Sequence, residues 1–314
     1  MNYVLGVDIG GTNIKLGIVK KNGEVLESDK VPTRAEAGPE KVALRLKGWL
    51  DERRSGFPEV EAAGLGCAGI LGGAEGFLYA SPNLPGWESV PLAQLFSGIL
   101  ALPVVAENDA NCAAYAEYVC GAGRGTRNFI CITLGTGVGG GIIIDGKLHR
   151  GSSGFAGEVG HTVIQIGGPK CSCGNLGCLE ALIGAGAIVE RAVRALDAGA
   201  ESMLRDVESL TVKDIAHAAY SGDKLAAGVL EETGRFLGIG LANLVHILNP
   251  EAVAVGGGVA GAGDFLLDPA REALADHVMD KDLTKVRIVP AELGNRASFV
   301  GAALLALGDN GEDL

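Results

Sequence analysis

The chain has 314 residues, which suits one large domain or two ordinary ones. Hydrophobic residues make up 47% and charged residues 20%, a composition that indicates a folded globular protein. The formal net charge of −12 argues against nucleic acid or an anionic membrane as a partner.

The chain begins with a strand pattern, MNYVLGVD, without the basic segment or cleavage site of a secretory signal. Apolar stretches such as 236–248 are short and are broken by Asn243 and His246, so no membrane span is expected. The 7 cysteines are an odd number, which favours reduced thiols and a cytoplasmic protein over a disulfide framework. The 50 glycines show no collagen-like period, and we expect them in turns and in close helix–strand contacts.

In chain order, the first part alternates strands and helices. We expect a three-stranded meander over 1–31, a helix over 38–54, a strand over 60–67, a loop over 70–90, a helix over 91–99, a strand over 103–106 and a helix over 110–120.

The second part repeats the meander over 128–150. Loops and short strands over 151–178, mostly helix over 179–245, a strand over 252–255, a helix over 269–279, a strand over 286–290 and a helix over 297–307 are expected to follow. Meanders alternating with helices predict an α/β fold with mixed sheets and two related halves. We expect a small N-terminal domain over 1–109, joined by the C-terminal helix 297–314, and a large domain over 110–296.

A Gly-rich turn occurs twice, each time between two apolar runs. Residues 4–19 read VLGVDIGGTNIKLGIV and residues 129–144 read FICITLGTGVGGGIII. Such turns let the backbone approach an anion and point N–H groups at it, although neither matches a Walker loop or a dinucleotide fingerprint. One copy alone is more simply a ligand-free hairpin. Two copies, with Asp8 placed to hold Mg²⁺ through water, predict a nucleotide in a cleft between two domains.

Three cysteines and one histidine cluster in GHTVIQIGGPKCSCGNLGCLE at 160–180. His161, Cys171, Cys173 and Cys178 are the ligand types of a tetrahedral Zn²⁺ site, and four protein ligands would make the metal structural. The alternative is a loop of reduced cysteines. Three thiols so close together in a polar loop are hard to bury, so the pattern favours zinc.

Two glutamates flank these ligands, Glu158 before His161 and Glu180 after Cys178. Carboxylates suit the adjacent hydroxyls of a polyol, although each glutamate alone is more simply a solvated surface charge. A zinc loop would hold both, and we expect them on the sugar side, away from the turns that bind phosphate.

Asp109 lies where an apolar strand runs into a helix, in the sequence Glu107-Asn108-Asp109. The carboxyl ends of strands are where α/β folds place ligands. Asp is also a preferred helix N-cap, which is the more common role for an aspartate in this position. The sequence leaves both roles open.

Together these residues resemble the ROK family of sugar kinases, repressors and related proteins, which has the two-domain hexokinase/actin-like ATPase (ribonuclease H-like) fold. The resemblance runs nearly end to end and rests on DIGGT at 8–12, AENDANCAAYAEY at 106–118, LGTGVGGG at 134–141, GEVGH at 157–161, CSCGNLGCLE at 171–180 and VGGGV at 255–259. SPNLPGWE at 81–88 resembles the sugar-side loop of the glucokinase branch.

The resemblance implies ATP-dependent phosphorylation of a hexose, foremost glucose at its 6-hydroxyl, by a dimer or tetramer. Asp109 would be the general base, and Asp8 would serve Mg²⁺. The sugar would contact Asn83, Asn108, Asp109, Glu158, His161 and Glu180. The phosphates would lie at Gly10, Gly11, Thr12, Gly135, Thr136 and Gly137, and the adenosine at Gly256, Gly257 and Gly258.

Two positions depart from the family pattern. Ala68 stands where proline is frequent, which affects the sugar loop, and Asn13 stands where lysine is frequent, which leaves less positive charge near the phosphates. The competing functions are a kinase for fructose or an N-acetylhexosamine (N-acetylglucosamine or N-acetylmannosamine), a sugar-responsive ROK regulator, and a zinc protein without kinase activity. A DNA-binding repressor would need a helix-turn-helix segment before Asp8, and the charge is unsuited to DNA.

Overall fold

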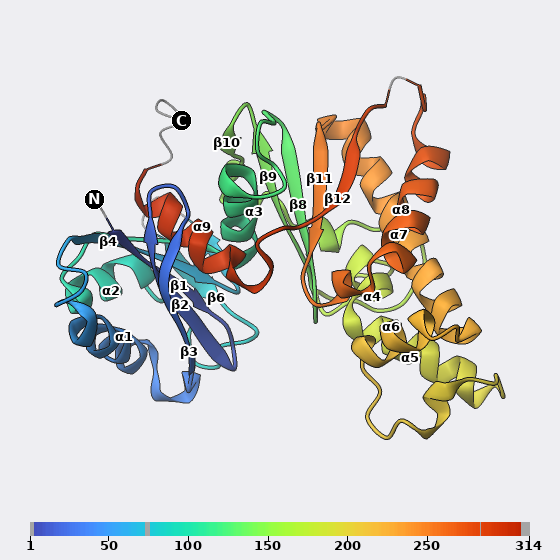
Figure 1. The fold of residues 1–314 in the computed structure, drawn as a ribbon, viewed down its shortest axis with the longest axis horizontal. Coiled ribbons are helices and arrows are strands. Elements are labelled where there is room, and N and C mark those ends of the chain that lie inside the picture. Colours follow the sequence, from blue (N-terminus) through green and yellow to red (C-terminus); the bar gives the residue numbers. More distant parts are fainter. Residues whose placement is uncertain (1–2, 73–75, 283, 309–314) are drawn as a thin grey trace. The chain divides into compact units, whose positions relative to one another are not determined.

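A computed structural model describes residues 3–72, 76–282 and 284–308, which form two compact units (Figure 1). The first unit comprises Met1–Arg127, Gly141–Gly157 and Leu293–Leu314, and the second comprises Asn128–Gly140 and Glu158–Glu292. Helix α3 (Asp109–Cys120) belongs to the first unit, because it packs on helix α9 (Ala297–Ala306). The predicted division into 1–109 and 110–296 stays a prediction, and 309–314 of its C-terminal helix lie outside the described residues.

The first unit is built on a mixed sheet of five strands. Their order is β3 (Val25–Pro32), β2 (Asn13–Lys20), β1 (Tyr3–Ile9), β4 (Val60–Cys67) and β7 (Val104–Asn108). The first three form an antiparallel meander, and β4 and β7 run parallel to β1. Helices α1 (Pro39–Arg53) and α2 (Leu92–Leu100) cover one face with a buried apolar core, and α3 and α9 belong to the other.

Two strand glycines let helix α9 lie directly against this sheet. A Cβ at Gly6 would lie 2.0 Å from the Phe299 carbonyl oxygen, and one at Gly64 would lie 1.8 Å from the Ala302 carbonyl oxygen. No side chain fits at either position. The expectation that glycines serve close helix–strand contacts is therefore confirmed here.

The second five-stranded sheet repeats the strand order of the first. It runs β10 (Lys147–Leu148), β9 (Val138–Ile144), β8 (Phe129–Leu134), β11 (Ala252–Gly256) and β12 (Arg287–Pro290), with β11 parallel to β8 and β12. The predicted α/β fold with mixed sheets and a repeated meander is confirmed.

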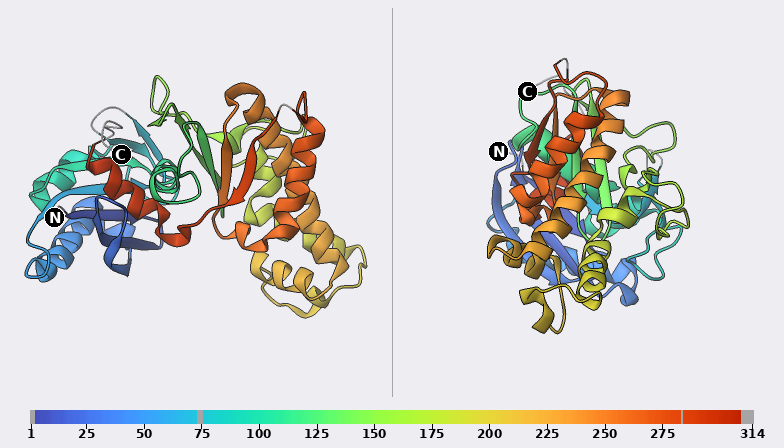
Figure 2. Two further views of the ribbon diagram at one scale, coloured as in Figure 1. Left: turned by 45° about the horizontal axis from the view of Figure 1, so that its top comes forward. Right: turned by 90° about the vertical axis from the view of Figure 1, so that its right-hand side faces the viewer.

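The described part of the second unit also contains five α-helices. They are α4 (Leu179–Ile183), α5 (Ala185–Asp197), α6 (Val212–Tyr220), α7 (Lys224–Leu248) and α8 (Asp264–His277), and α7 and α8 pack side by side (Figure 2). Short 3₁₀ turns occupy η1 (Ala35–Ala37), η2 (Val159–His161), η3 (Met203–Asp206), η4 (Val259–Ala262) and η5 (Gly294–Arg296). Among the described helices, none has the length and apolar character needed to cross a membrane.

Two expected elements differ from the structure. The segment 70–90, expected as loop, contains the hairpin strands β5 (Ile70–Gly72) and β6 (Phe77–Ala80), whose shortness hid them among turn residues; 73–75 lie outside the described residues. Helix α8 begins at Asp264 and includes Pro269, which the prediction had taken as its start.

Candidate active site

Three parallel strands of the first unit end at the same edge of its sheet. Ile9, Cys67 and Asn108 are in register across β1, β4 and β7. Burial and then the negative charges of Asp109 and Asp8 raise the pKa of the Cys67 thiol well above its usual range. The two carboxylates predicted for the general base and for Mg²⁺ therefore belong to one edge, where α/β sheets place ligands.

Asn108 is the N-cap of α3. Its Oδ1 accepts hydrogen bonds from Ala110 N at 2.8 Å and from Asn111 N at 3.2 Å, and its Nδ2 donates to the Gly69 carbonyl oxygen at 3.2 Å. Asp109 is the first residue of the helix and is half-buried. The capping role that competed with catalysis at Asp109 therefore belongs to its neighbour.

Beside this cap the buried Glu107 forms an ion pair with the partly exposed Arg150, which sequence reasoning missed. Arg150 Nε donates to Glu107 Oε2 at 2.6 Å, while Oε1 accepts from Asn108 N at 2.8 Å and Asn111 Nδ2 at 3.0 Å. Both residues line a cavity of about 430 Å³ in the first unit. A glutamate at the end of an apolar strand was the available signal, because a buried charge requires a partner.

Asp8 is buried and forms an ion pair with Lys15, whose Nζ lies 3.2 Å from Oδ2. The two residues are direct cross-strand partners on β1 and β2, on either side of the first glycine turn (residues 10–12). The sequence motifs did not single out Lys15, which lies two residues after Asn13 on β2. Side chains two residues apart on a strand point to the same face, so Asn13 and Lys15 share one face of β2. Lys15 therefore supplies the positive charge that Asn13 lacks.

The 81–88 loop packs against the first glycine turn. A Cβ at Gly11 would lie 2.7 Å from the Asn83 carbonyl oxygen. Ser81 Oγ donates to the Ala68 carbonyl oxygen at 2.6 Å. A hydrogen bond therefore holds the backbone at Ala68, the position where the family pattern often has proline. The structure therefore brings the predicted sugar loop to the predicted phosphate turn, within one unit.

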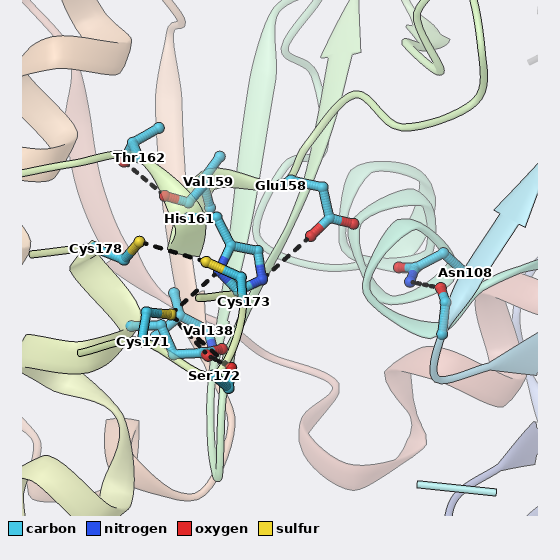
Figure 3. A network of polar contacts seen from close by, with 12 residues as sticks. Asn108, Val138, Glu158, Val159, His161, Thr162, Cys171, Ser172, Cys173 and Cys178 are labelled. Carbon is cyan, nitrogen blue, oxygen red and sulfur yellow. Dashed lines mark hydrogen bonds and ion pairs between the residues drawn. The ribbon is translucent and has the colours of Figure 1, made fainter. Parts of the chain in front are cut away.

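The predicted zinc ligands converge in the second unit (Figure 3). The ligand atoms of His161, Cys171, Cys173 and Cys178 all lie within 4.8 Å of one another. A tetrahedral zinc with bonds of about 2.3 Å keeps its sulfurs about 3.8 Å apart. The Cys173–Cys178 sulfur separation is 3.7 Å, and Cys171 Sγ lies 3.6 Å from His161 Nδ1. These separations fit one tetrahedral ion.

The two ring nitrogens of His161 face different groups. Nδ1 faces the Cys171 sulfur, and Nε2 lies 3.8 Å from Oε2 of Glu158, whose side chain is exposed (Figure 3). An imidazole that ligates through Nδ1 keeps Nε2 for a second partner. This geometry suits the double role expected of His161.

Glu180 ties the metal loop (residues 161–178) to the second glycine turn (residues 135–137). Its Oε2 accepts from Val138 N at 3.0 Å, and its Oε1 accepts from Ser172 Oγ at 2.8 Å. A Cβ at Gly137 would lie 2.5 Å from the same carboxylate. The expected separation of Glu180 from the phosphate turns is wrong, because its carboxylate hydrogen-bonds to the residue that follows one of them.

The remaining glycines predicted at the nucleotide also come together in the second unit. Gly135 N donates to the Gly137 carbonyl oxygen at 2.9 Å, which closes the second glycine turn around the exposed Thr136. Gly257 has a φ of +87°, and a Cβ there would lie 2.2 Å from the Leu134 carbonyl oxygen. The 256–258 segment at the end of β11 therefore packs on the end of β8, next to that turn.

Comparisons with known proteins agree with these motifs. The ROK family model matches residues 4–309. The chain is 40% identical to a glucokinase of Streptomyces coelicolor over 98% of both chains. The chain belongs to the ROK family. It is also 33% identical to an N-acetylmannosamine kinase of Salmonella typhi, over 97% of this chain and 98% of that one.

A similar solved structure is the ROK glucokinase of Streptomyces griseus in complex with glucose and AMPPNP. It matches with a TM-score of 0.85 and 38% identity, over 98% of this chain and 99% of that chain. Similarity over the whole length confirms the predicted fold class of the ROK sugar kinases.

Proposed function

We propose that the chain is an ATP-dependent hexose kinase that makes glucose 6-phosphate. The observation that carries the proposal is the edge of the first sheet, where Asp109 follows the Asn108 cap and Asp8 precedes a glycine turn. Similarity to glucokinases over the full length supports glucose as the acceptor and ATP as the donor.

In this reaction the 6-hydroxyl oxygen forms a bond to the γ-phosphorus while the bond from that phosphorus to the β-bridging oxygen breaks. Asp109 accepts the hydroxyl proton, and ADP leaves. Phosphoryl transfer depends mainly on positioning and charge neutralisation, and Mg²⁺ bound with ATP supplies much of the latter. Asp8 would hold the ion through water, and Lys15, its ion-pair partner, would neutralise phosphate beside it.

We assign sugar contacts within each unit. In the first unit they are Asn83, Asn108 and Asp109. In the second they are Glu158, His161 and Glu180. Backbone N–H groups of the two glycine turns would bind the phosphates, and the 256–258 segment would lie by the adenosine.

We further propose one structural Zn²⁺ held by His161, Cys171, Cys173 and Cys178. When bound, the ion cross-links a loop rich in glycine and so orders the residues beside it. Elemental analysis of protein purified without added metal should find about one equivalent of zinc per chain. Metal-free protein with full activity and unchanged thermal stability would refute the site.

The test of the function is a coupled assay of the purified protein with a panel of hexoses and N-acetylhexosamines, using ATP and polyphosphate as donors. We expect the highest kcat/KM for glucose with ATP. Preference for N-acetylmannosamine, N-acetylglucosamine or fructose would support kinase activity but change the assigned sugar. The similarity to an N-acetylmannosamine kinase supports the first of these alternatives. No transfer to any sugar would refute the kinase.

A further inference from the structure

The first glycine turn has little conformational preference of its own. Gly10 and Gly11 restrict the backbone weakly, and both Gly11 and Thr12 are exposed. Within the turn, Gly10 N donates to the Asn13 carbonyl oxygen at 3.2 Å. A turn that must present N–H groups to phosphate at fixed positions needs support from elsewhere in the chain.

Thr33 provides that support from the segment between β3 and α1. Its side chain is fully buried, with 0% exposure. Its Oγ1 donates to the Gly10 carbonyl oxygen at 2.5 Å, and its backbone N donates to the Thr12 carbonyl oxygen at 2.9 Å. One residue thus holds both ends of the turn.

Helix α1 in turn holds Thr33 in place. Arg45 Nη2 donates to the Thr33 carbonyl oxygen, and Nη1 donates to the Pro32 carbonyl oxygen, each at 2.7 Å. Hydrogen bonds from a charged donor are stronger than neutral ones. Through Thr33, the position of the turn therefore depends on helix α1, which packs on the core of the first unit.

The same segment reaches the 81–88 loop. The buried Trp87 donates from Nε1 to the Ala35 carbonyl oxygen at 3.1 Å. Gly11 meets Asn83 of that loop directly. Residues 32–35 thus hold the proposed phosphate turn and the proposed sugar loop by separate hydrogen bonds.

We infer that Thr33 is a positioning residue for phosphoryl transfer, and that residues 32–35, anchored by Arg45, keep the first glycine turn in its nucleotide-binding shape. This inference rests on the proposed function. Without the Thr33 hydroxyl, the Gly10 carbonyl oxygen loses its buried donor, and the turn gains alternative conformations that bind phosphate less well.

The test compares Thr33→Val, which removes only the hydroxyl, with Thr33→Ser, which retains it. Thr126→Val is the matched control, because Thr126 is also buried and donates from Oγ1 to a turn carbonyl, that of Gly123, at 2.6 Å. The assays are kcat, the KM values for ATP and glucose, AMPPNP affinity and thermal unfolding.

For Thr33→Val we expect kcat/KM for ATP and the AMPPNP affinity to fall about tenfold or more, with a smaller change in the KM for glucose. Thr33→Ser should recover most of the loss. Thr126→Val should lose comparable thermal stability and retain nucleotide binding. If Thr33→Val bound nucleotide like Thr126→Val, the inference would be wrong.

Failure of the proposed function can be told apart from failure of this inference. A wild-type protein that phosphorylates no sugar refutes the kinase, while AMPPNP affinity still compares Thr33→Val with Thr126→Val. If Thr33→Val does not fold, Arg45→Lys weakens the same support while keeping the charge. It should lower AMPPNP affinity in the same direction, and unchanged affinity would count against the role of residues 32–35.

Discussion

The two glycine turns follow strands that hold the same place in sheets of the same order, yet only the strands on either side of the first turn carry charged residues. Asp8 pairs with Gly66 on β4, and Thr133 pairs with Gly256 on β11, so a hydroxyl stands where the first sheet has a carboxylate. Strand β2 brings Lys15 to Asp8, whereas β9 reads VGGGIII. The repeated topology thus gives each sheet a glycine turn at the same place, and under the proposed function the side chains beside the first turn would assign it the metal ion and the reacting phosphate.

The two turns are also held in different ways. The first is held by the Thr33 hydroxyl, which comes from the segment between β3 and α1. The second leads into Val138, whose N–H is bound by Glu180, next to the metal loop. The direct support of the second turn is therefore a carboxylate that also accepts a hydrogen bond from the metal loop, whereas the direct support of the first is a neutral hydroxyl.

The largest expected effect tests whether chemistry belongs to the first sheet alone. Asp109→Asn removes the proton acceptor with little change in shape, so kcat should fall by about 10²–10⁴. The matched variant is Glu292→Gln, which makes the same change just after β12, the corresponding edge strand of the second sheet, and should retain kcat.

Circular dichroism and glucose binding serve as controls for folding. If Asp109→Asn kept near wild-type turnover, Asp109 would not be the general base. If the variant were inactive because it failed to fold, Asp109 would have a structural role that the Asn108 cap does not account for.

The next comparison sets the two turns against each other directly. Asp8→Asn removes the metal-side carboxylate and leaves Lys15 without its ion partner, so the KM for MgATP should rise about 10- to 100-fold. Thr133→Val changes the equivalent position of the second sheet and should alter that KM by less than about threefold. The measurement is a titration of ATP and Mg²⁺. If both variants raised the KM for MgATP equally, both turns would contribute to binding the metal ion.

Glu180→Gln tests how the second turn is ordered. Loss of a charged acceptor should raise the KM for glucose about 10- to 100-fold, because a charged group paired to a hydroxyl contributes about 1.5–3 kcal/mol. Its bond to Val138 N adds a smaller rise, about two- to fivefold, in the KM for ATP at saturating glucose. If only the KM for ATP changed, Glu180 would not contact the sugar, and its role would be limited to supporting the second glycine turn.

The sequence predicted local features well and distant pairings poorly. Strand periodicity and the motifs were sufficient for both meanders and for the convergence of His161 with the three cysteines, because these depend on residues close in sequence. The Glu107–Arg150 pair and the Thr33–Gly10 bond join residues far apart in the chain. A threonine or an arginine carries no local mark of such a partner, so the structure was needed to find them.

The smallest effect is a pH dependence of stability from the Cys67 thiol at the edge of the first sheet, where the corresponding position of the second sheet is Gly257 after β11. Burial, aided by the charges of Asp109 and Asp8, holds the pKa of the Cys67 thiol well above its ordinary value of 9.0. Above pH 9 the unfolded chain loses this proton and the folded chain keeps it, so ionisation favours unfolding. Stability that is complete below pH 9 should therefore fall as pH rises, by up to about 1.4 kcal/mol per pH unit from this thiol. Cys67→Ala should shift the urea midpoint at every pH because of lost packing, but its decline from pH 9 to 10.5 should be shallower than that of the wild type. Parallel declines would show that the Cys67 thiol ionises as readily in the folded protein as in the unfolded chain, and that its edge of the sheet is more open to water than the structure indicates.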